Sequence, residues 1–268
     1  ITMAITSGVI PDPDGNCIGP FVVSALFLAP TTRSGEAFKA EEKVNKMALL
    51  SSLSYSPYVN NDGVWSQQIR PMSGKARPAL FLDRDGVIVD EVGYLHRPED
   101  VHLSQGAVEV IQTANKRDVF VIIVTNQSGI GRGKYGWAEF SVVQETILNA
   151  LRAQNAYIDA VYACPFHGEG KGHWKVKDHP DRKPRPGMLV RAANTFPINI
   201  KDSWIIGDRA VDINAGKNAG LAGGVQLLSG HGSKQEEYSK TLKLADHNFR
   251  VHVCQDMRFT TKICPLLC

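Results

Sequence analysis

From residue 77 onward, short apolar runs alternate with stretches that are apolar on one side only. Apolar residues at three- and four-residue spacing indicate helices, and short β-branched runs indicate buried strands. The pattern predicts strands at 78–82, 119–124, 158–163, 203–206 and 221–228. It predicts helices at 105–117, 137–154, 187–194 and 210–219, a less regular one at 235–244, and irregular loops at 90–100 and 164–186. Strands that alternate with helices imply right-handed crossovers, so we expect an α/β fold with a doubly wound, mainly parallel sheet.

The regions on either side of this pattern give weaker signals. Residues 1–74 contain turn formers, an interrupted apolar run at 17–30 and a possible short helix at 35–53. Met72 directly precedes the first convincing strand, so we expect residues 1–74 to be a poorly defined extension, with residues 1–71 outside the catalytic unit. We expect the domain itself to span 75–232. Residues 233–268, which carry three cysteines and lose all periodicity after 251, should form a weakly structured tail.

Composition narrows the class of protein. The chain has 268 residues, is 43% hydrophobic and carries a net charge of +3, which is too mild to indicate nucleic-acid binding. Five scattered cysteines fit reduced thiols better than a disulfide framework. The longest apolar run is too short to span a bilayer. We therefore expect a cytoplasmic protein, a monomer or small homo-oligomer, that binds a small phosphorylated metabolite and neither nucleic acid nor membrane.

Two carboxylates follow the first predicted strand. Asp83 and Asp85 stand one residue apart, just before Gly86. In an extended chain such residues point the same way, here toward the crevice where open α/β sheets bind ligands. Two close carboxylates repel unless a cation lies between them, which suits Mg²⁺ and leaves one of them free to act as a nucleophile. An ordinary turn, or the start of a calcium loop, is the alternative.

Further polar residues follow later strands of the predicted sheet, and parallel strands would bring them to the same edge as Asp83 and Asp85. Thr125 follows the second strand and precedes a glycine turn, where hydroxyl and backbone N–H groups hold phosphate oxygens well. Lys183 lies in the long loop, and Asp208 and Asp212 follow the fourth strand. Each alone has an ordinary explanation, as a helix cap, a solvated loop charge or a first-turn helix acid. Together, at one edge of one sheet, they favour phosphate chemistry.

This ordered set resembles the haloacid dehalogenase (HAD) superfamily of phosphotransferases. Its four motifs match Asp83-x-Asp85-Gly86, Thr125, Lys183 and Asp208-x-x-x-Asp212, and the resemblance covers residues 77–230. Residues 125–133 and 182–188 are similar to the D-glycero-D-manno-heptose 1,7-bisphosphate 7-phosphatase group. The related histidinol-phosphate phosphatases usually have an aspartate where this chain has Ser128, which favours the sugar-phosphate side. The resemblance implies a HAD-like Rossmannoid domain without a large cap.

The resemblance also implies roles for individual residues. Asp83 would be the nucleophile that forms an aspartyl-phosphate, and Asp85 would act as general acid and base. Mg²⁺ would be held by the Asp83 carboxylate, the Asp85 backbone carbonyl and Asp208. Thr125 and Lys183 would hold the phosphoryl oxygens, with Asp212 supporting Lys183 or the metal. The candidates for substrate binding are Asn126, Arg132 and Arg182, the two arginines for a second anionic group.

The long loop departs from the heptose bisphosphatase pattern. That group usually binds a structural Zn²⁺ through Cys-x-His and Cys-x-Cys. This chain matches at Cys164 but has Phe166, His179 and Asp181 at the other three positions. Another zinc site could combine Cys164, His167, His173 and His179, because cysteine and histidine are good zinc ligands. A metal-free loop is the alternative, and the altered loop weakens the substrate assignment.

Three other functions stay open at this point. The first is another HAD phosphatase, acting on histidinol phosphate or a different small phosphomonoester. The second is a non-catalytic, phosphate-binding regulatory domain, because fold alone does not imply activity. The third is a zinc-dependent interaction module built on the Cys/His loop and the tail cysteines. The presence of nucleophile, acid, lysine and metal-binding carboxylates together favours an enzyme.

Overall fold

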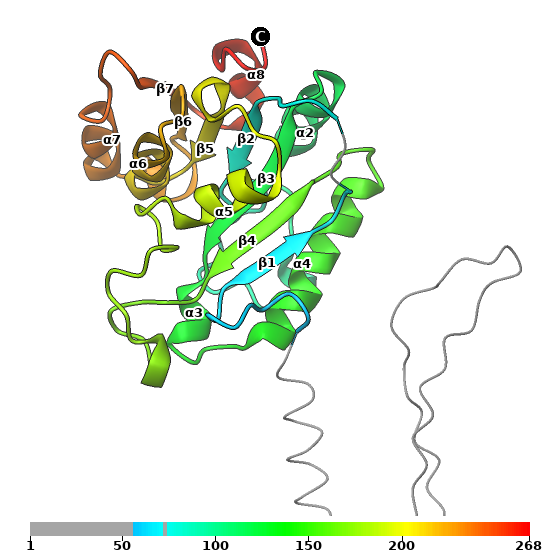
Figure 1. The fold of residues 1–268 in the computed structure, drawn as a ribbon, viewed down its shortest axis with the longest axis vertical. Helices are drawn as coiled ribbons and strands as arrows, with labels where there is room; N and C mark the ends of the chain where they lie inside the picture. The colour runs from blue at the N-terminus through cyan, green and yellow to red at the C-terminus, as the bar shows by residue number, and fades with distance from the viewer. Residues whose placement is uncertain (1–55, 72–73) are drawn as a thin grey trace, which may run out of the picture. The chain divides into compact units, whose positions relative to one another are not determined.

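A computed structural model describes residues 56–71 and 74–268 (Figure 1). In this part of the chain one seven-stranded sheet has the order β1-β4-β3-β2-β5-β6-β7. β1 pairs antiparallel with β4, and the other neighbours pair parallel. The strands are β1 (Trp65–Gln68), β2 (Ala79–Leu82), β3 (Phe120–Asn126), β4 (Ala160–Cys164), β5 (Trp204–Gly207), β6 (Gly223–Leu227) and β7 (Arg250–Cys254). The predicted α/β fold with a mainly parallel sheet is therefore confirmed.

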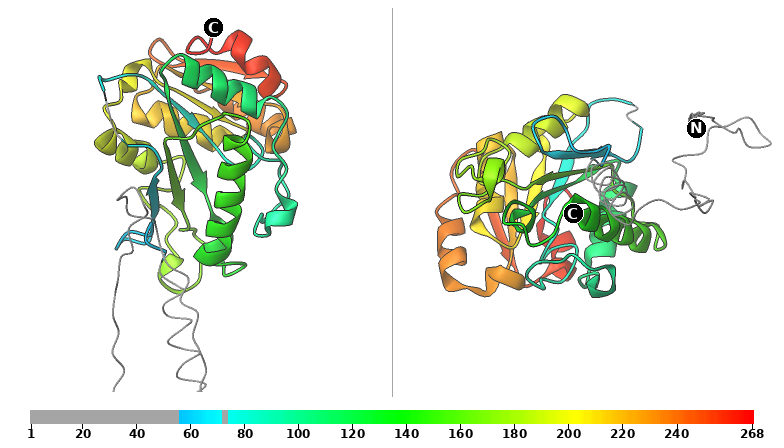
Figure 2. Two further views of the ribbon diagram at one scale, coloured as in Figure 1. Left: turned by 90° about the vertical axis from the view of Figure 1, so that its right-hand side faces the viewer. Right: turned by 90° about the horizontal axis from the view of Figure 1, so that it is seen from below.

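Helices cover both faces of the sheet. They are α2 (Ala107–Lys116), α3 (Ser128–Gly131), α4 (Trp137–Arg152), α5 (Gly187–Thr195), α6 (Ala210–Ala219), α7 (Gln235–Leu242) and α8 (Thr260–Ile263). Residues of α2 and α4 share one core cluster, and residues of α5 and α6 share the cluster on the opposite face (Figure 2). Each strand and helix predicted between 78 and 244 has a counterpart in the structure, displaced by at most a few residues. Between β2 and α2 the chain forms a loop with a single 3₁₀ turn, Pro98–Asp100, and no large cap.

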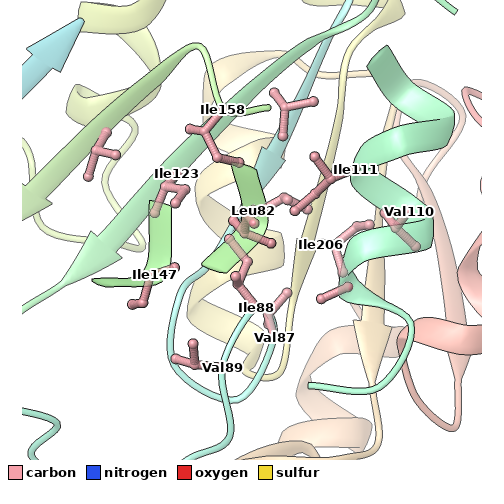
Figure 3. Packing of buried hydrophobic residues seen from close by; sticks show 14 of the residues in the cluster. Leu82, Val87, Ile88, Val89, Val110, Ile111, Ile123, Ile147, Ile158 and Ile206 are labelled. Atoms are coloured by element: carbon pink, nitrogen blue, oxygen red, sulfur yellow. The ribbon is translucent and has the colours of Figure 1, made fainter. Parts of the chain in front are cut away.

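The central strand β2 packs on both faces, which explains its unbroken apolar sequence. Leu80 and Leu82 belong to the core under α2 and α4, whereas Ala79 and Phe81 belong to the core under α5 and α6. Figure 3 shows Leu82 among residues of β3, β5 and α2. Burying each large side chain of this kind contributes about 1.5–3 kcal/mol. This packing fixes the position of β2 and of its carboxyl end, which Asp83 directly follows.

Strand β1 overturns the expectation that the segment before residue 75 lies outside the domain. Trp65 is only 1% exposed, and its ring centroid lies 5.5 Å from that of Trp137 and 4.9 Å from that of Phe140, both in α4. β1 adds the one antiparallel edge to the sheet. A four-residue edge strand has no periodicity long enough to recognise, because its stability comes from side chains distant in sequence. The possible helix at 35–53 lies outside the described residues.

The C-terminal region also differs from its expectation as a weakly structured tail. β7 pairs in parallel with β6 over five residues, and α7 and α8 flank it. Cys264 and Leu267 are buried in the same core as α2. The domain therefore extends beyond 232 to the end of the chain. None of the helices in the described ranges is long and apolar enough to cross a membrane.

Candidate active site

The carboxyl ends of β2, β3 and β5 form the centre of the site. β2 lies between β3 and β5, and the chain continues from β2 to one side of the sheet and returns later on the other. Ligands bind at such a point of reversal in open α/β sheets. A cavity of about 450 Å³ opens here. Every residue predicted to be catalytic, metal-binding, supporting or substrate-binding lines it: Asp83, Asp85, Thr125, Asn126, Arg132, Arg182, Lys183, Asp208 and Asp212.

Lys183 is the electrostatic centre of this site. Its Nζ lies 2.8 Å from Asp83 Oδ1 and 2.7 Å from Asp212 Oδ1, and it donates a third hydrogen bond of 2.8 Å to the backbone oxygen of Val124. Burial alone would lower the pKa of Lys183, but Asp212 and Asp83 raise it. The ammonium group therefore stays charged although it is buried. Burial raises the pKa of Asp83 to about 7, against the opposing effect of Lys183.

Asp208 has one oxygen that is paired and one that is not. Its Oδ2 accepts a 2.8 Å hydrogen bond from the backbone N–H of His231, whose ring Nδ1 lies 3.3 Å away. Its Oδ1 is buried without a hydrogen-bond partner. Burial, with Asp212 and Asp83 adding to it, raises the pKa of Asp208 to about 8. Gly86 (φ +80°) makes room for this carboxylate, since a Cβ there would lie 2.6 Å from Asp208 Oδ2.

These carboxylates fit a divalent cation. Oxygen atoms of Asp83, Asp208 and Asp212 lie within 4.8 Å of one another, the single such group of potential ligands found in residues 56–71 and 74–268. The unpartnered Asp208 oxygen offers a ligand to a hard cation, whose charge would offset the mutual repulsion that helps to raise the pKa values of Asp83 and Asp208. Oxygen-only donors suit Mg²⁺ better than zinc or copper.

Asp85 points to a different set of partners from Asp83. Arg84, which is fully buried, donates to Asp85 through Nη2 at 2.9 Å and Nε at 3.1 Å. Gln127 Nε2 donates to the other Asp85 oxygen at 2.9 Å, and Tyr135 donates to Gln127 Oε1. Asp85 is thus oriented by a chain of side chains behind it. Sequence reasoning missed this role for Arg84 and Gln127, although both stand inside motifs that it did recognise.

Thr125 and Asn126 lie at the end of β3, and their side chains have different hydrogen-bond partners. Thr125 is buried, and its Oγ1 accepts a 2.8 Å hydrogen bond from Gln127 Nε2. Asn126 was predicted to bind substrate. Its Oδ1 instead accepts from the backbone N–H of Lys183 at 3.0 Å, and its Nδ2 donates to the backbone oxygen of Lys183 at 3.1 Å. Both polar atoms of Asn126 therefore hold the lysine backbone.

The two predicted anion-binding arginines lie at the wall of the cavity. Arg132 pairs with Glu169 at 2.8 Å and also contacts Tyr94 and His167. Arg182 Nη1 donates to the backbone oxygen of Phe166 at 2.9 Å. The cavity is also lined by Arg84, by Arg209 and by His231, and sequence reasoning singled out none of the three. His231 comes shortly after the end of β6, and Asp208 comes directly after the end of β5. The position of His231 after a predicted strand could therefore have indicated that it lies at the same edge of the sheet.

The four candidate zinc ligands of the long loop are not brought together. Cys164 ends β4 in the core, and burial raises its pKa to about 12. The ring of His179 stacks on Phe166, His173 lies against Trp174, and His167 contacts Arg132. No group of three or more potential ligands within the described ranges includes any of them.

Together, the fold and the groups at the strand ends define a HAD-type hydrolase. Comparison with known proteins agrees. A family model described as HAD-hyrolase-like matches residues 181–250. The chain is 41% identical over 181 residues to the D-glycero-beta-D-manno-heptose-1,7-bisphosphate 7-phosphatase of Mesorhizobium japonicum, which covers 66% of this chain and 82% of the relative.

Two further relatives extend the comparison. The D-glycero-alpha-D-manno-heptose-1,7-bisphosphate 7-phosphatase of Burkholderia mallei is 40% identical over 151 residues, covering 56% of this chain and 78% of that protein. The crystal structure of D,D-heptose 1,7-bisphosphate phosphatase from B. bronchiseptica, complexed with magnesium and phosphate, is similar with a TM-score of 0.56 and 27% identity. It covers 68% of this chain and 94% of that one. The chain belongs to the HAD superfamily, in the family of these bisphosphate phosphatases, and is a phosphoric monoester hydrolase.

Proposed function

We propose that this protein is a Mg²⁺-dependent phosphatase that hydrolyses D-glycero-D-manno-heptose 1,7-bisphosphate through an aspartyl-phosphate. The observation that carries the proposal is the cluster of Asp83, Lys183, Asp208 and Asp212, with a buried, unpartnered oxygen on Asp208. The substrate comes from the relatives, whose names include both the alpha and the beta anomer. The proposal therefore covers either anomer.

In the first half of the reaction, an Asp83 oxygen attacks the phosphorus and the bond from phosphorus to the sugar oxygen breaks. Asp85 gives its proton to that leaving oxygen, so the sugar departs as an alcohol. Lys183 offsets the charge of the phosphoryl oxygens from a fixed position, because its three acceptors hold Nζ in place. Thr125 contributes its hydroxyl to the same oxygens.

In the second half, Asp85 removes a proton from a water molecule that attacks the phosphorus of the aspartyl-phosphate. The bond from phosphorus to Asp83 breaks, which frees inorganic phosphate and restores the carboxylate. Arg84 and Gln127 keep Asp85 oriented through both proton transfers. Mg²⁺ held by the Asp83 carboxylate, the Asp208 carboxylate and the Asp85 backbone carbonyl would neutralise phosphoryl charge.

Arg132 and Arg182 support a bisphosphorylated substrate. Both line the cavity, and a guanidinium group binds phosphate in a bidentate manner. A cavity of about 450 Å³ falls within the range of small-molecule sites. When one phosphate of the substrate lies at Lys183, the second would therefore bind to Arg132 or Arg182.

The test is Mg²⁺-dependent phosphate release from a panel: both heptose 1,7-bisphosphate anomers, sugar monophosphates and histidinol phosphate. We expect preference for a heptose bisphosphate, with loss of that preference in Arg132→Ala and retention of activity on monophosphates. Activity on other phosphomonoesters alone would support the phosphatase mechanism and would refute heptose bisphosphate as the substrate. Absence of activity from folded protein across the panel would favour a phosphate-binding regulatory role.

A further inference from the structure

Residues 164–186 form the loop that carries Arg182 and Lys183 into the site, and aromatic stacking holds its two ends together. The ring of His179 lies 3.8 Å from the ring of Phe166, with 6° between the planes, and Trp174 packs on Phe166 at 5.2 Å. His179 Nδ1 accepts a 3.2 Å hydrogen bond from the backbone N–H of Asp181. Nδ1 is therefore unprotonated, so the neutral ring packs on the phenyl face.

Asp181 extends this contact to helix α5. The carboxylate of Asp181 is almost fully buried, and Arg191 donates to both of its oxygens, from Nε at 2.6 Å and from Nη2 at 2.9 Å. The same guanidinium group pairs with Asp62, in the segment that leads into β1. A bidentate, partly buried pair of this kind is among the stronger polar contacts in proteins. Arg191 thus joins helix α5 and the end of the loop to a segment 129 residues earlier in the sequence.

Gly63 brings the segment before β1 directly against the loop. Its φ of +80° favours glycine, and a Cβ at this position would lie 2.6 Å from the Trp174 ring and 3.5 Å from the Phe166 ring. Val64, the next residue, shares a core cluster with Phe166. Residues 56–71 therefore contact the loop through both packing and charge.

These contacts occupy the positions at which the family resemblance implies zinc ligands. Phe166 has no donor atom, both oxygens of Asp181 are engaged by Arg191, and the His179 Nδ1 accepts a backbone hydrogen bond. Zinc requires about four thiolate, imidazole or carboxylate ligands in tetrahedral geometry. His179 and Asp181 are of ligand type, but no group of three potential ligands among the described residues includes them or Cys164, so the residues present do not fit a zinc ion.

We propose that a metal-free clasp anchors this loop and positions Lys183, and that residues 56–71 are part of the catalytic unit because they complete it. The clasp comprises the His179–Phe166 stack and the ion pairs that Arg191 makes with Asp181 and Asp62. Asp181 lies two residues before Lys183, and Phe166 also accepts the hydrogen bond from Arg182. The clasp residues position the lysine and do not touch the reacting atoms. This inference rests on the proposed function only where catalysis is the readout.

The first test is metal content. The full chain is purified without added zinc and without chelator, and zinc is counted by mass spectrometry before and after treatment with a zinc-specific chelator. We expect far less than one zinc per chain and an unchanged melting temperature after treatment. One zinc per chain, whose removal lowers the melting temperature, would overturn the proposal. This readout does not depend on any substrate.

The second test compares two substitutions in the same loop. Asp181→Asn removes the buried partner of Arg191. Asp178→Asn makes the same chemical change in an exposed pair with Arg185, whose nearest atoms are 3.9 Å apart. We expect Asp181→Asn to raise amide hydrogen exchange across 164–186 and to lower kcat about tenfold to a hundredfold, because a displaced lysine stabilises the transition state poorly. Asp178→Asn should change neither.

A third variant, Asp62→Asn, tests the contribution of the segment before β1. We expect a smaller increase in exchange over the same loop residues, because this pair is partly exposed. Unchanged exchange in Asp181→Asn would refute the clasp, and unchanged exchange in Asp62→Asn would refute the part assigned to residues 56–71. Exchange is measured without substrate, so either failure is distinguishable from a wrong substrate assignment.

Discussion

Asn126 forms two hydrogen bonds with the backbone of Lys183, accepting from its N–H at 3.0 Å and donating to its carbonyl at 3.1 Å. The end of β3 and the irregular loop are thereby joined at the residue that carries the central cation. Each of these bonds uses one of the two hydrogen-bonding capacities of the amide atom. We propose that Asn126 acts chiefly by positioning Lys183.

Asn126→Ala should therefore lower kcat about tenfold while changing KM for a substrate less than threefold, since the transition state depends most on the position of Lys183. The matched control is Asn115→Ala. Asn115 makes the same pair of hydrogen bonds to the backbone of Tyr157, and neither residue lines the active-site cavity. Each variant should lose about 1–3 kcal/mol of stability, and only Asn126→Ala should lose turnover. A KM increase with unchanged kcat would restore the substrate-binding role.

The carboxylate cluster predicts an unusual dependence of stability on pH. The pKa of Asp83 is raised to about 7 and that of Asp208 to about 8, chiefly by burial. A carboxyl whose pKa is higher in the folded state contributes stability below its unfolded pKa, and that stability is lost as the pH rises through the folded value. The melting temperature of the metal-free protein should therefore fall as the pH rises from about 4 to about 8, and these two groups should cause no further fall above that range.

Mg²⁺ should counteract this loss. Protons compete with the cation for the same oxygens, so addition of Mg²⁺ should raise the melting temperature more at pH 8.5 than at pH 6. Differential scanning fluorimetry with and without Mg²⁺ at both pH values measures the effect. Asp208→Asn, which removes one of the two titrating groups, should reduce both trends. An equal Mg²⁺ shift at the two pH values would contradict the metal assignment.

The site was largely predictable because strand ends are predictable. Asp83, Thr125 and Asp208 each follow an apolar run, and parallel strands bring such residues to one edge. Those positions do not indicate how the side chains beyond the strand ends are oriented or which groups they bind. The use of Asn126 on a backbone, and of Gln127 on Asp85, depends on rotamers set by the packing of the whole crevice.

The fold was predictable where elements have a clear apolar pattern, which includes the short buried strands β2 and β5, and it was not predictable at the two edges of the sheet. Helix α4, with sixteen residues, has an unmistakable apolar stripe. Strands β1 and β7 lie at the two edges of the sheet, with four and five residues that are only partly apolar. Their places are decided by partners such as Trp137 for Trp65, more than seventy residues away. Pairs such as Arg191 with Asp62 leave no trace in local sequence for the same reason.

Trp65 supplies a direct test of whether β1 belongs to the domain. Trp65→Ala in the full chain should lower the free energy of unfolding by about 3–5 kcal/mol, because it leaves a cavity against two aromatic rings of α4. Tyr58→Ala is the control, since its ring also contacts that of Trp65, at a centroid distance of 5.2 Å, but is exposed. A chain that begins at Met72 lacks β1 altogether and should fold poorly. Folding and activity equal to those of the full chain would return residues 56–71 to the status of an extension.

Cysteine reactivity tests the packing of the C-terminal region. Burial raises the pKa of Cys264 to about 12 and that of Cys164 to about 12, whereas Cys268 is exposed. The thiolate is the reactive form, so iodoacetamide at pH 8 should label Cys268 long before the other two. Peptide mass mapping over a time course measures the rates. Rapid labelling of Cys264 in native protein would show that α8 does not pack as described.

If Asp83 is the nucleophile, it carries a phosphoryl group during turnover. The Mg²⁺-loaded protein is mixed with heptose 1,7-bisphosphate, quenched in acid during turnover and digested, and the peptide that contains Asp83 is examined by mass spectrometry. We expect one added phosphoryl group on Asp83. It should be absent from the Asp83→Asn variant, which should fold normally and release no phosphate. Phosphate release by Asp83→Asn, or turnover without any phosphorylated form of this peptide, would contradict the assignment of Asp83 as the nucleophile.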